Sequence, residues 1–189
     1  MNRVPDRLWL TGNMILGDNI NVSKLLSKIV RCDLCEIYLA LDTKFTINDF
    51  AFLTQSGTVK SIICENGIYK SHKNDDVAPL EDILSCVLTA DSIEFSNVYF
   101  AKETMKKLTL LNFHQKLTQF ILEHINQMLD VNLMDHFLKK NLEDRACVSL
   151  NFNDENHSRI FKSQIFEKIN AWFPKERKPR TFPKEFVSE

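Results

Sequence analysis

The sequence of 189 residues lacks the motifs that mark the common enzyme classes. Its four glycines lie far apart, so they form neither a phosphate-binding loop nor a dinucleotide-binding fingerprint. Its five histidines form no H-E-x-x-H pair, and no serine lies in a G-x-S-x-G turn. We therefore expect no catalytic residues, no cofactor and no metal. An active site built from residues distant in the sequence would escape such a search.

The sequence also lacks an excess of charge and any long apolar run. Lysine and arginine number 24 against 25 acidic residues, a net charge of -1, which argues against nucleic acid or an anionic membrane as the partner. No segment approaches the roughly 18 consecutive apolar residues of a transmembrane helix, and the first seven residues lack the apolar part of a signal peptide. These absences predict an intracellular protein, cytoplasmic or nuclear, with no nucleic acid and no membrane partner.

Cysteine is present five times, an odd number that does not suit a disulfide framework. In a reducing compartment these residues would act as small apolar side chains. Cys32 and Cys35 have the C-x-x-C spacing of a zinc or redox pair, but no second pair follows them. We therefore interpret all five as structural.

What the chain does contain is a repeated apolar pattern, L-x-x-F-x-L, which is clearest at Leu117–Leu122. With substitutions it occurs six times, about 28 residues apart, and leucine-rich repeats have periods of roughly 20–29 residues with one strand and one helix each. The middle residues of the six copies are Leu8, Ile37, Ile62, Ile93, Phe120 and Val148. The sequence therefore predicts an α/β fold, a leucine-rich-repeat-like solenoid of about six strand-helix units with a parallel sheet in sequence order.

One feature of leucine-rich repeats is mostly missing, namely the asparagine that closes the turn after each strand. Only the first and last copies have it, as Asn13 and Asn153. The other four copies have Asp42, Gly67, Val98 and Ile125 at that position. We expect most units to close their turns in another way.

The predicted domain covers residues 1–173. Its last helix, predicted over residues 158–173, has an apolar stripe wide enough to close the end of a solenoid. From Pro174 onwards the chain contains three prolines and several lysines and arginines. We interpret residues 174–189 as a basic, proline-rich, disordered tail. A localisation signal or a partner-binding segment is the alternative for this tail.

Alternation along the predicted strands places one set of side chains on the concave face of the solenoid. Aromatic and aliphatic residues lie there beside carboxylates, a combination that suits a protein partner with some positive charge and does not suit a phosphate backbone. The predicted protein-binding residues are Trp9, Tyr38, Ile63, Glu94, Ile121, Glu36, Glu65, Gln119 and Glu123. The alternative is that the chain itself covers the N-terminal members of this set.

Two stretches resemble the repeat region of nematode F-box-associated proteins, which have irregular leucine-rich-like repeats. They are the segment from Asp130–Asn141 to Ser149–Phe152, and Thr46–Phe50 before a Val-Lys-Ser strand. The resemblance extends from Leu8 to Phe173. It implies a non-catalytic protein-protein interaction module, the substrate-recognition part of an F-box-type ubiquitin ligase.

The F-box itself is not expected in this chain. Its three packed helices would need roughly 40–50 residues, and the first predicted strand begins by Leu8. Binding to the ubiquitin-ligase adaptor is therefore in doubt. The competing hypothesis is a compact α/β enzyme whose active site is not visible in the sequence. Such an enzyme would show a reversal in strand order with a cleft at that point.

Overall fold

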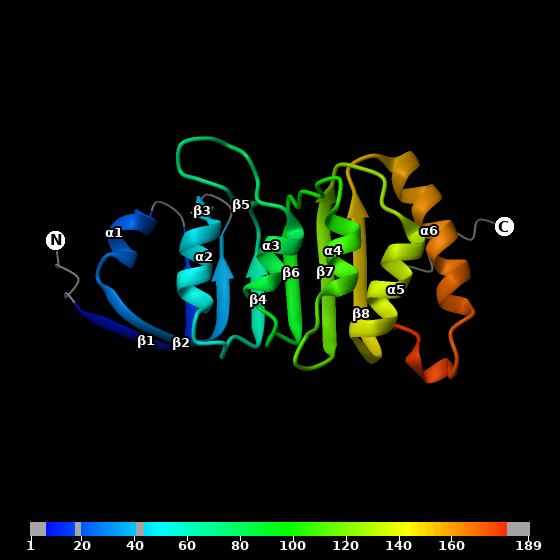
Figure 1. The fold of residues 1–189 in the computed structure, drawn as a ribbon, viewed down its shortest axis with the longest axis horizontal. Helices are drawn as coiled ribbons and strands as arrows, with labels where there is room; N and C mark the ends of the chain where they lie inside the picture. Colours follow the sequence, from blue (N-terminus) through cyan, green and yellow to red (C-terminus); the bar gives the residue numbers. More distant parts are fainter. Residues whose placement is uncertain (1–6, 18–19, 41–43, 181–189) are drawn as a thin grey trace.

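The computed structural model describes residues 7–17, 20–40 and 44–180 (Figure 1). Its main feature is a six-stranded sheet in which all neighbouring strands are parallel. The strands are β1 (Leu8–Leu16), β2 (Ile29–Leu39), β4 (Ser61–Cys64), β6 (Ser92–Ser96), β7 (Leu117–Ile125) and β8 (Leu142–Phe152). They lie side by side in sequence order, which confirms the predicted α/β class and strand order. Among the described strands there is no reversal of order, the feature at which doubly wound enzymes bind their ligands.

The helices line up on one side of the sheet. Figure 1 shows α2 to α5 in front of the strands, with α1 at the N-terminal end and α6 beside β8 at the C-terminal end. The helices are α1 (Val22–Leu26), α2 (Ile47–Thr54), α3 (Leu80–Ser85), α4 (Thr104–Leu110), α5 (Val131–Asn141) and α6 (Glu155–Asn170). A short second parallel sheet pairs β3 (Phe45–Thr46) with β5 (Ile68–Tyr69). No helix in the described ranges is both long and apolar enough to cross a lipid bilayer.

Side-chain caps fix where the helices begin. The Thr46 hydroxyl accepts a hydrogen bond from the Asp49 backbone N–H, and the Asp49 carboxylate accepts one from the Thr46 N–H, so α2 starts with a capping box. The Asp130 carboxylate accepts bonds from the first backbone N–H groups of α5. Asn21 caps α1 in the same manner. These three caps fix the first turns of α1, α2 and α5.

The core lies between the sheet and the helices. Alternate residues of each strand point into it, and six phenylalanines are among its largest fully buried side chains: Phe45, Phe50, Phe95, Phe120, Phe137 and Phe161. The rings of Phe120 on β7 and Phe137 on α5 lie 5.2 Å apart, and those of Phe50 on α2 and Phe95 on β6 lie 6.2 Å apart. These ring pairs join α2 and α5 to the sheet by direct packing.

The register of the first strand differs from the prediction. The repeat pattern places Leu8 beside Ile37, whereas the structure pairs Met14 with Ile37. Met14 and Leu16 are the buried residues of β1, and Leu8 is only partly buried. The strand pairs with β2 along its whole length, with a shift in register after Gly12, whose φ is +77°. Two apolar pairs with the same spacing lie on this strand, and the prediction chose the wrong one.

The last helix also differs from its prediction. Helix α6 buries Phe161, Ile165 and Ile169, whereas Ile160 and Phe166 of the predicted stripe remain 44% and 40% exposed. The buried stripe is therefore narrower than expected. Beyond the helix, Trp172 is buried and its indole N–H donates to the Asp135 carboxylate of α5 at 2.7 Å.

Part of the predicted tail contacts the domain. Residues Lys175–Arg177 form a short 3-10 helix, and the Arg180 backbone N–H donates to the Ala146 carbonyl of β8 at 3.0 Å. Residues 181–189 of the predicted tail, and 1–6 of the predicted domain, lie outside the described residues. The domain boundaries and the disorder of the tail stay predictions.

Candidate functional site

The candidate site is the face of the sheet that points away from the helices, which we call the open face. Its middle line, here called the central row, has one residue on each of the six strands, paired across every strand boundary. The central row consists of Ile15, Tyr38, Ile63, Glu94, Ile121 and Ser149. All of these side chains are partly or fully exposed, and Ile15 is 75% exposed. Four of its six members are the predicted residues from β2 to β7.

Trp9 is the one predicted residue that the structure places elsewhere. It pairs with Arg31, seven residues before Tyr38 on β2, so about 23 Å of strand separates it from the central row. The indole N–H of Trp9 donates to Asp33 at 2.9 Å, and the Arg31 guanidinium lies over its ring at 4.6 Å. Ile15 takes the place that the prediction gave to Trp9. The shifted register of β1 is the cause.

The remaining predicted residues flank the central row. Glu36 and Gln119 lie in a line that pairs Asn13, Glu36, Ser61, Ser92, Gln119 and Cys147 across the sheet. Glu65 and Glu123 lie at the opposite, carboxyl end of the strands, where Ser96 pairs with Glu123. The structure therefore brings eight of the nine predicted residues onto one surface.

The four glutamates of the open face are held by neutral donors. Each accepts a hydrogen bond from a side chain of a neighbouring strand. Glu36 accepts from Asn13 at 2.7 Å, Glu65 from the Tyr38 hydroxyl, Glu94 from Gln119 at 3.4 Å and Glu123 from Asn151 at 3.4 Å. Within the described part of the chain, none of the four forms an ion pair with a lysine, arginine or histidine. The hydrogen bonds hold the four carboxylates in place, and no described cation neutralises their charge.

Glu94 lies at the centre of this charge. Burial, and then the negative charges of Glu123 and Glu65, raise the pKa of the Glu94 carboxyl above its ordinary value. No group of three or more histidine, cysteine, aspartate or glutamate side chains among the described residues is arranged to hold a metal ion. The four glutamates form an acidic patch on the open face.

We expect Glu94→Gln to stabilise the fold at pH 7 by a few tenths of a kcal/mol, an effect kept small by solvent screening. A raised pKa in the folded state means that ionisation of Glu94 costs stability. The cost exists above the folded pKa and is absent below the unfolded pKa of about 4.3, where both states bind the proton. Urea unfolding at pH 7 and pH 4 measures it. An equal gain at both pH values, or an equal gain in the exposed-site control Glu143→Gln, would contradict this account.

The C-x-x-C pair lies on both faces of one strand. Cys32 is buried and Cys35 is exposed. Residues three apart on a strand point to opposite faces and lie about 10 Å apart, beyond the roughly 7 Å that a disulfide spans. The C-x-x-C spacing of Cys32 and Cys35 therefore does not bring the two thiols together.

One group of side chains has the composition of a catalytic triad and was missed in the sequence. The Nε2 atom of His72 lies 3.3 Å from the Ser23 hydroxyl and 3.0 Å from the Asp49 carboxylate. A Ser-His-Asp relay requires the serine and the acid on opposite ring nitrogens, whereas here one nitrogen contacts both. Asp49 also accepts from Thr46 in the cap of α2. The geometry is that of a contact between α1, α2 and the loop after β5.

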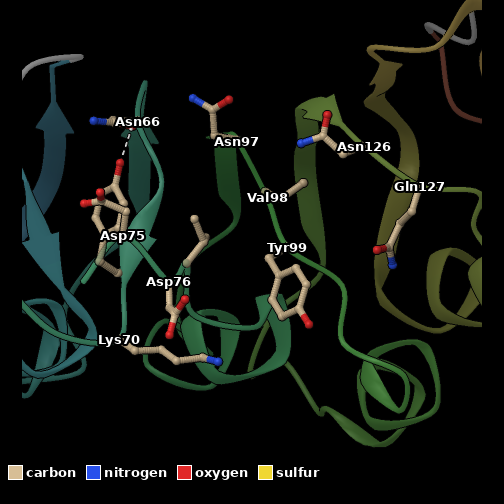
Figure 2. A pocket seen from close by; sticks show the side chains of 11 residues that line it. Asn66, Lys70, Asp75, Asp76, Asn97, Val98, Tyr99, Asn126 and Gln127 are labelled. Atoms are coloured by element: carbon tan, nitrogen blue, oxygen red, sulfur yellow. Dashed lines mark hydrogen bonds between the residues drawn. The ribbon is translucent and has the colours of Figure 1, made fainter.

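A pocket of about 600 Å³ lies at the carboxyl ends of β4, β6 and β7 (Figure 2). Figure 2 shows Asn66, Asn97 and Asn126 in a line along one rim, at the ends of three neighbouring strands, with Tyr99 below them. The repeat pattern predicted asparagine at positions 67, 98 and 125. Asn66, Asn97 and Asn126 each lie one residue from those positions. Allowing an offset of one residue would have found them.

These asparagines serve the turns in different ways. The Asn66 side chain accepts from the Gly67 N–H at 2.8 Å and from the Tyr69 hydroxyl at 3.2 Å. Asn97 has a φ of +53°, a left-handed conformation that asparagine tolerates better than most residues. The turns after β4 and β6 thus use local asparagine geometry. Comparison with protein-family models, with curated proteins and with solved structures finds no match for this chain.

Proposed function

We propose that this chain is a non-catalytic protein-interaction module whose open face binds a segment of a partner protein that carries both lysine or arginine and apolar side chains. The observation that carries the proposal is the central row, in which Ile15 is exposed and Tyr38, Ile63 and Ile121 are partly exposed. Beside them lie four glutamates that form no ion pair with a described residue. Apolar side chains at the centre of an interface provide affinity, and the charge around them attracts and orients the partner.

We also propose that the fold is a leucine-rich-repeat-like solenoid. Strands that follow sequence order, each with a helix on the same side, support this architecture. So does a second line of parallel contacts, in which β3 pairs with β5 and Pro79 pairs with Tyr99. In such a fold equivalent residues of successive units form continuous rows, and such rows commonly bind partners.

The resemblance to nematode F-box-associated proteins supports a narrower form of the proposal. The partner would then be a substrate that is delivered to a ubiquitin ligase, and this chain would supply the substrate-recognition surface. Binding to the ligase adaptor forms no part of the proposal.

The test is affinity capture followed by titration with the captured partner. The wild type is compared with Tyr38→Ala/Ile63→Ser/Ile121→Ser, and the matched control is Leu110→Ser/Ile160→Ser, which removes exposed apolar side chains on the helical side. We expect the open-face variant to bind at least tenfold more weakly and the control to bind normally, with thermal unfolding showing that both are folded.

Charge provides an independent readout of the same complex. Affinity for the wild type should fall as salt is raised, and Glu36→Gln/Glu94→Gln/Glu123→Gln should weaken both the affinity and its dependence on salt. Equal binding by all variants would contradict the proposal. Ligase components among the captured proteins would support the narrower form, and a complete absence of them would argue against it.

A further inference from the structure

The pocket at the carboxyl ends of β4, β6 and β7 differs from the open face in its charge. Its acidic residues, Asp75 and Asp76, are matched by two nearby lysines. The Lys44 ammonium lies 2.7 Å from the Asp75 carboxylate, and Lys70 lines the pocket itself. A charged ligand would find no net attraction here, so the pocket favours a neutral ligand.

Amide groups make up much of its polar lining. Gln127 is already bonded to the Phe100 carbonyl at 2.7 Å. The side chain of Asn97 makes no hydrogen bond to any described residue, and Asn126 uses only its carbonyl oxygen, which accepts from Asn153. Figure 2 shows the amide nitrogen of Asn126 turned toward the middle of the pocket. One complete amide and one amide N–H₂ group are therefore available to a ligand.

The rest of the lining is apolar. Val98 is buried, Val77 is half-buried and the Tyr99 ring is 43% exposed. The Lys70 ammonium lies 5.8 Å from the centre of that ring, so one part of the ring is occupied by the chain's own cation. These side chains provide a surface on which a ligand's apolar group can rest beside the free amides.

We propose that this pocket binds an extended, uncharged peptide segment, with its backbone N–H and C=O groups paired to Asn97 and Asn126 and an apolar side chain resting on Val98 and Tyr99. A side-chain amide presents a donor and an acceptor in one plane, as a peptide bond does, so the two are complementary. The volume of about 600 Å³ falls in the range of ligand-binding pockets. The inference rests on the proposed function, because the segment would belong to the partner that covers the open face.

The test uses peptides selected from a random-peptide display library on the immobilised wild-type chain. Among the selected peptides, those that the open-face variant Tyr38→Ala/Ile63→Ser/Ile121→Ser still binds should be uncharged and should bind with little change between low and high salt. Asn97→Ala/Asn126→Ala should weaken them about tenfold, as the loss of two ordinary hydrogen bonds implies. Asn112→Ala/Asn132→Ala, a matched pair of exposed asparagines, should bind them as the wild type does.

Two further readouts keep the outcomes separate. The side-chain amide signals of Asn97 and Asn126 in a ¹H–¹⁵N spectrum should shift on titration with a selected peptide. Failure to select any peptide would overturn the inference, as would selected peptides that bind the double variant Asn97→Ala/Asn126→Ala normally. The inference would also be overturned if the pocket bound a neutral trisaccharide such as maltotriose and no peptide. The open-face variant should still bind the peptides, so this inference and the proposed function can fail independently.

Discussion

Replacing Phe120 with alanine is expected to lower the free energy of unfolding by about 3–5 kcal/mol. The side chain is fully buried on β7, a central strand, and its ring packs against Phe137 of α5 at 5.2 Å. Alanine removes that packing and leaves a cavity that the sheet on one side and the helix on the other prevent from closing. Since domains of this size are stable by roughly 5–15 kcal/mol, the variant should be close to unfolding at physiological temperature.

Urea unfolding followed by circular dichroism measures this loss. Phe166→Ala is the matched control, because that ring is 40% exposed on α6, and it should cost less than about 1 kcal/mol. A small effect for Phe120→Ala, comparable with the control, would mean that β7 and α5 are not packed as described.

On β2 to β8 the apolar pair with the repeat spacing that the pattern selects is buried in the core, so the sequence predicted the register of these strands correctly. Ile37, Ile62, Ile93, Phe120 and Val148 are paired across the sheet as the pattern required. β1 has two such pairs, Leu8 with Leu10 and Met14 with Leu16, and local spacing does not distinguish them. Which of the two pairs lies beside Ile37 depends on the register between β1 and β2. That register is set by contacts between the two strands and not by the local sequence of β1.

The same limit applies to the candidate site. Alternation along the strands identified Tyr38, Ile63, Glu94 and Ile121, because period-two alternation places a residue on a known face. It gave no information about which neutral side chains hold the glutamates, since those partners lie about 25 residues away in the sequence. Nor did spacing predict the partial exposure of Ile160 on α6, because helical spacing identifies an apolar face but does not say which elements pack against it.

The arrangement of the open face implies a balance between stability and binding. Neutral donors give each of these carboxylates one hydrogen bond and leave the negative charges of Glu65, Glu94 and Glu123 close together. Lysines in place of these donors would neutralise that charge. The repulsion lowers stability slightly, and under the proposed function it creates the negative field that a basic partner would neutralise on binding.

A buried hydroxyl in the helical layer should have the second-largest effect on stability. Thr104, at the start of α4, is fully buried. Its hydroxyl accepts a hydrogen bond from the Ala101 backbone N–H at 2.7 Å and donates one to the Glu81 carboxylate of α3 at 2.5 Å. Thr104→Val keeps the shape but leaves two buried polar groups without these partners, so we expect a loss of about 2–3 kcal/mol. Thr104→Ser keeps the hydroxyl and should lose only about 1 kcal/mol, the contribution of one buried methyl group.

The same urea unfolding measurement separates the hydrogen bonds from the packing. Thr109→Val serves as the control, because the Thr109 hydroxyl bonds only the Lys106 carbonyl of its own helix at an exposed site, and it should change stability by less than about 0.5 kcal/mol. If valine at 104 proved as stable as serine, the link between α3 and α4 would depend on packing alone. Thr104 lies on the helical side of the sheet, so the folded valine variant should still bind a partner at the open face with wild-type affinity. Unchanged affinity would show that Thr104 supports the fold and does not contact the partner.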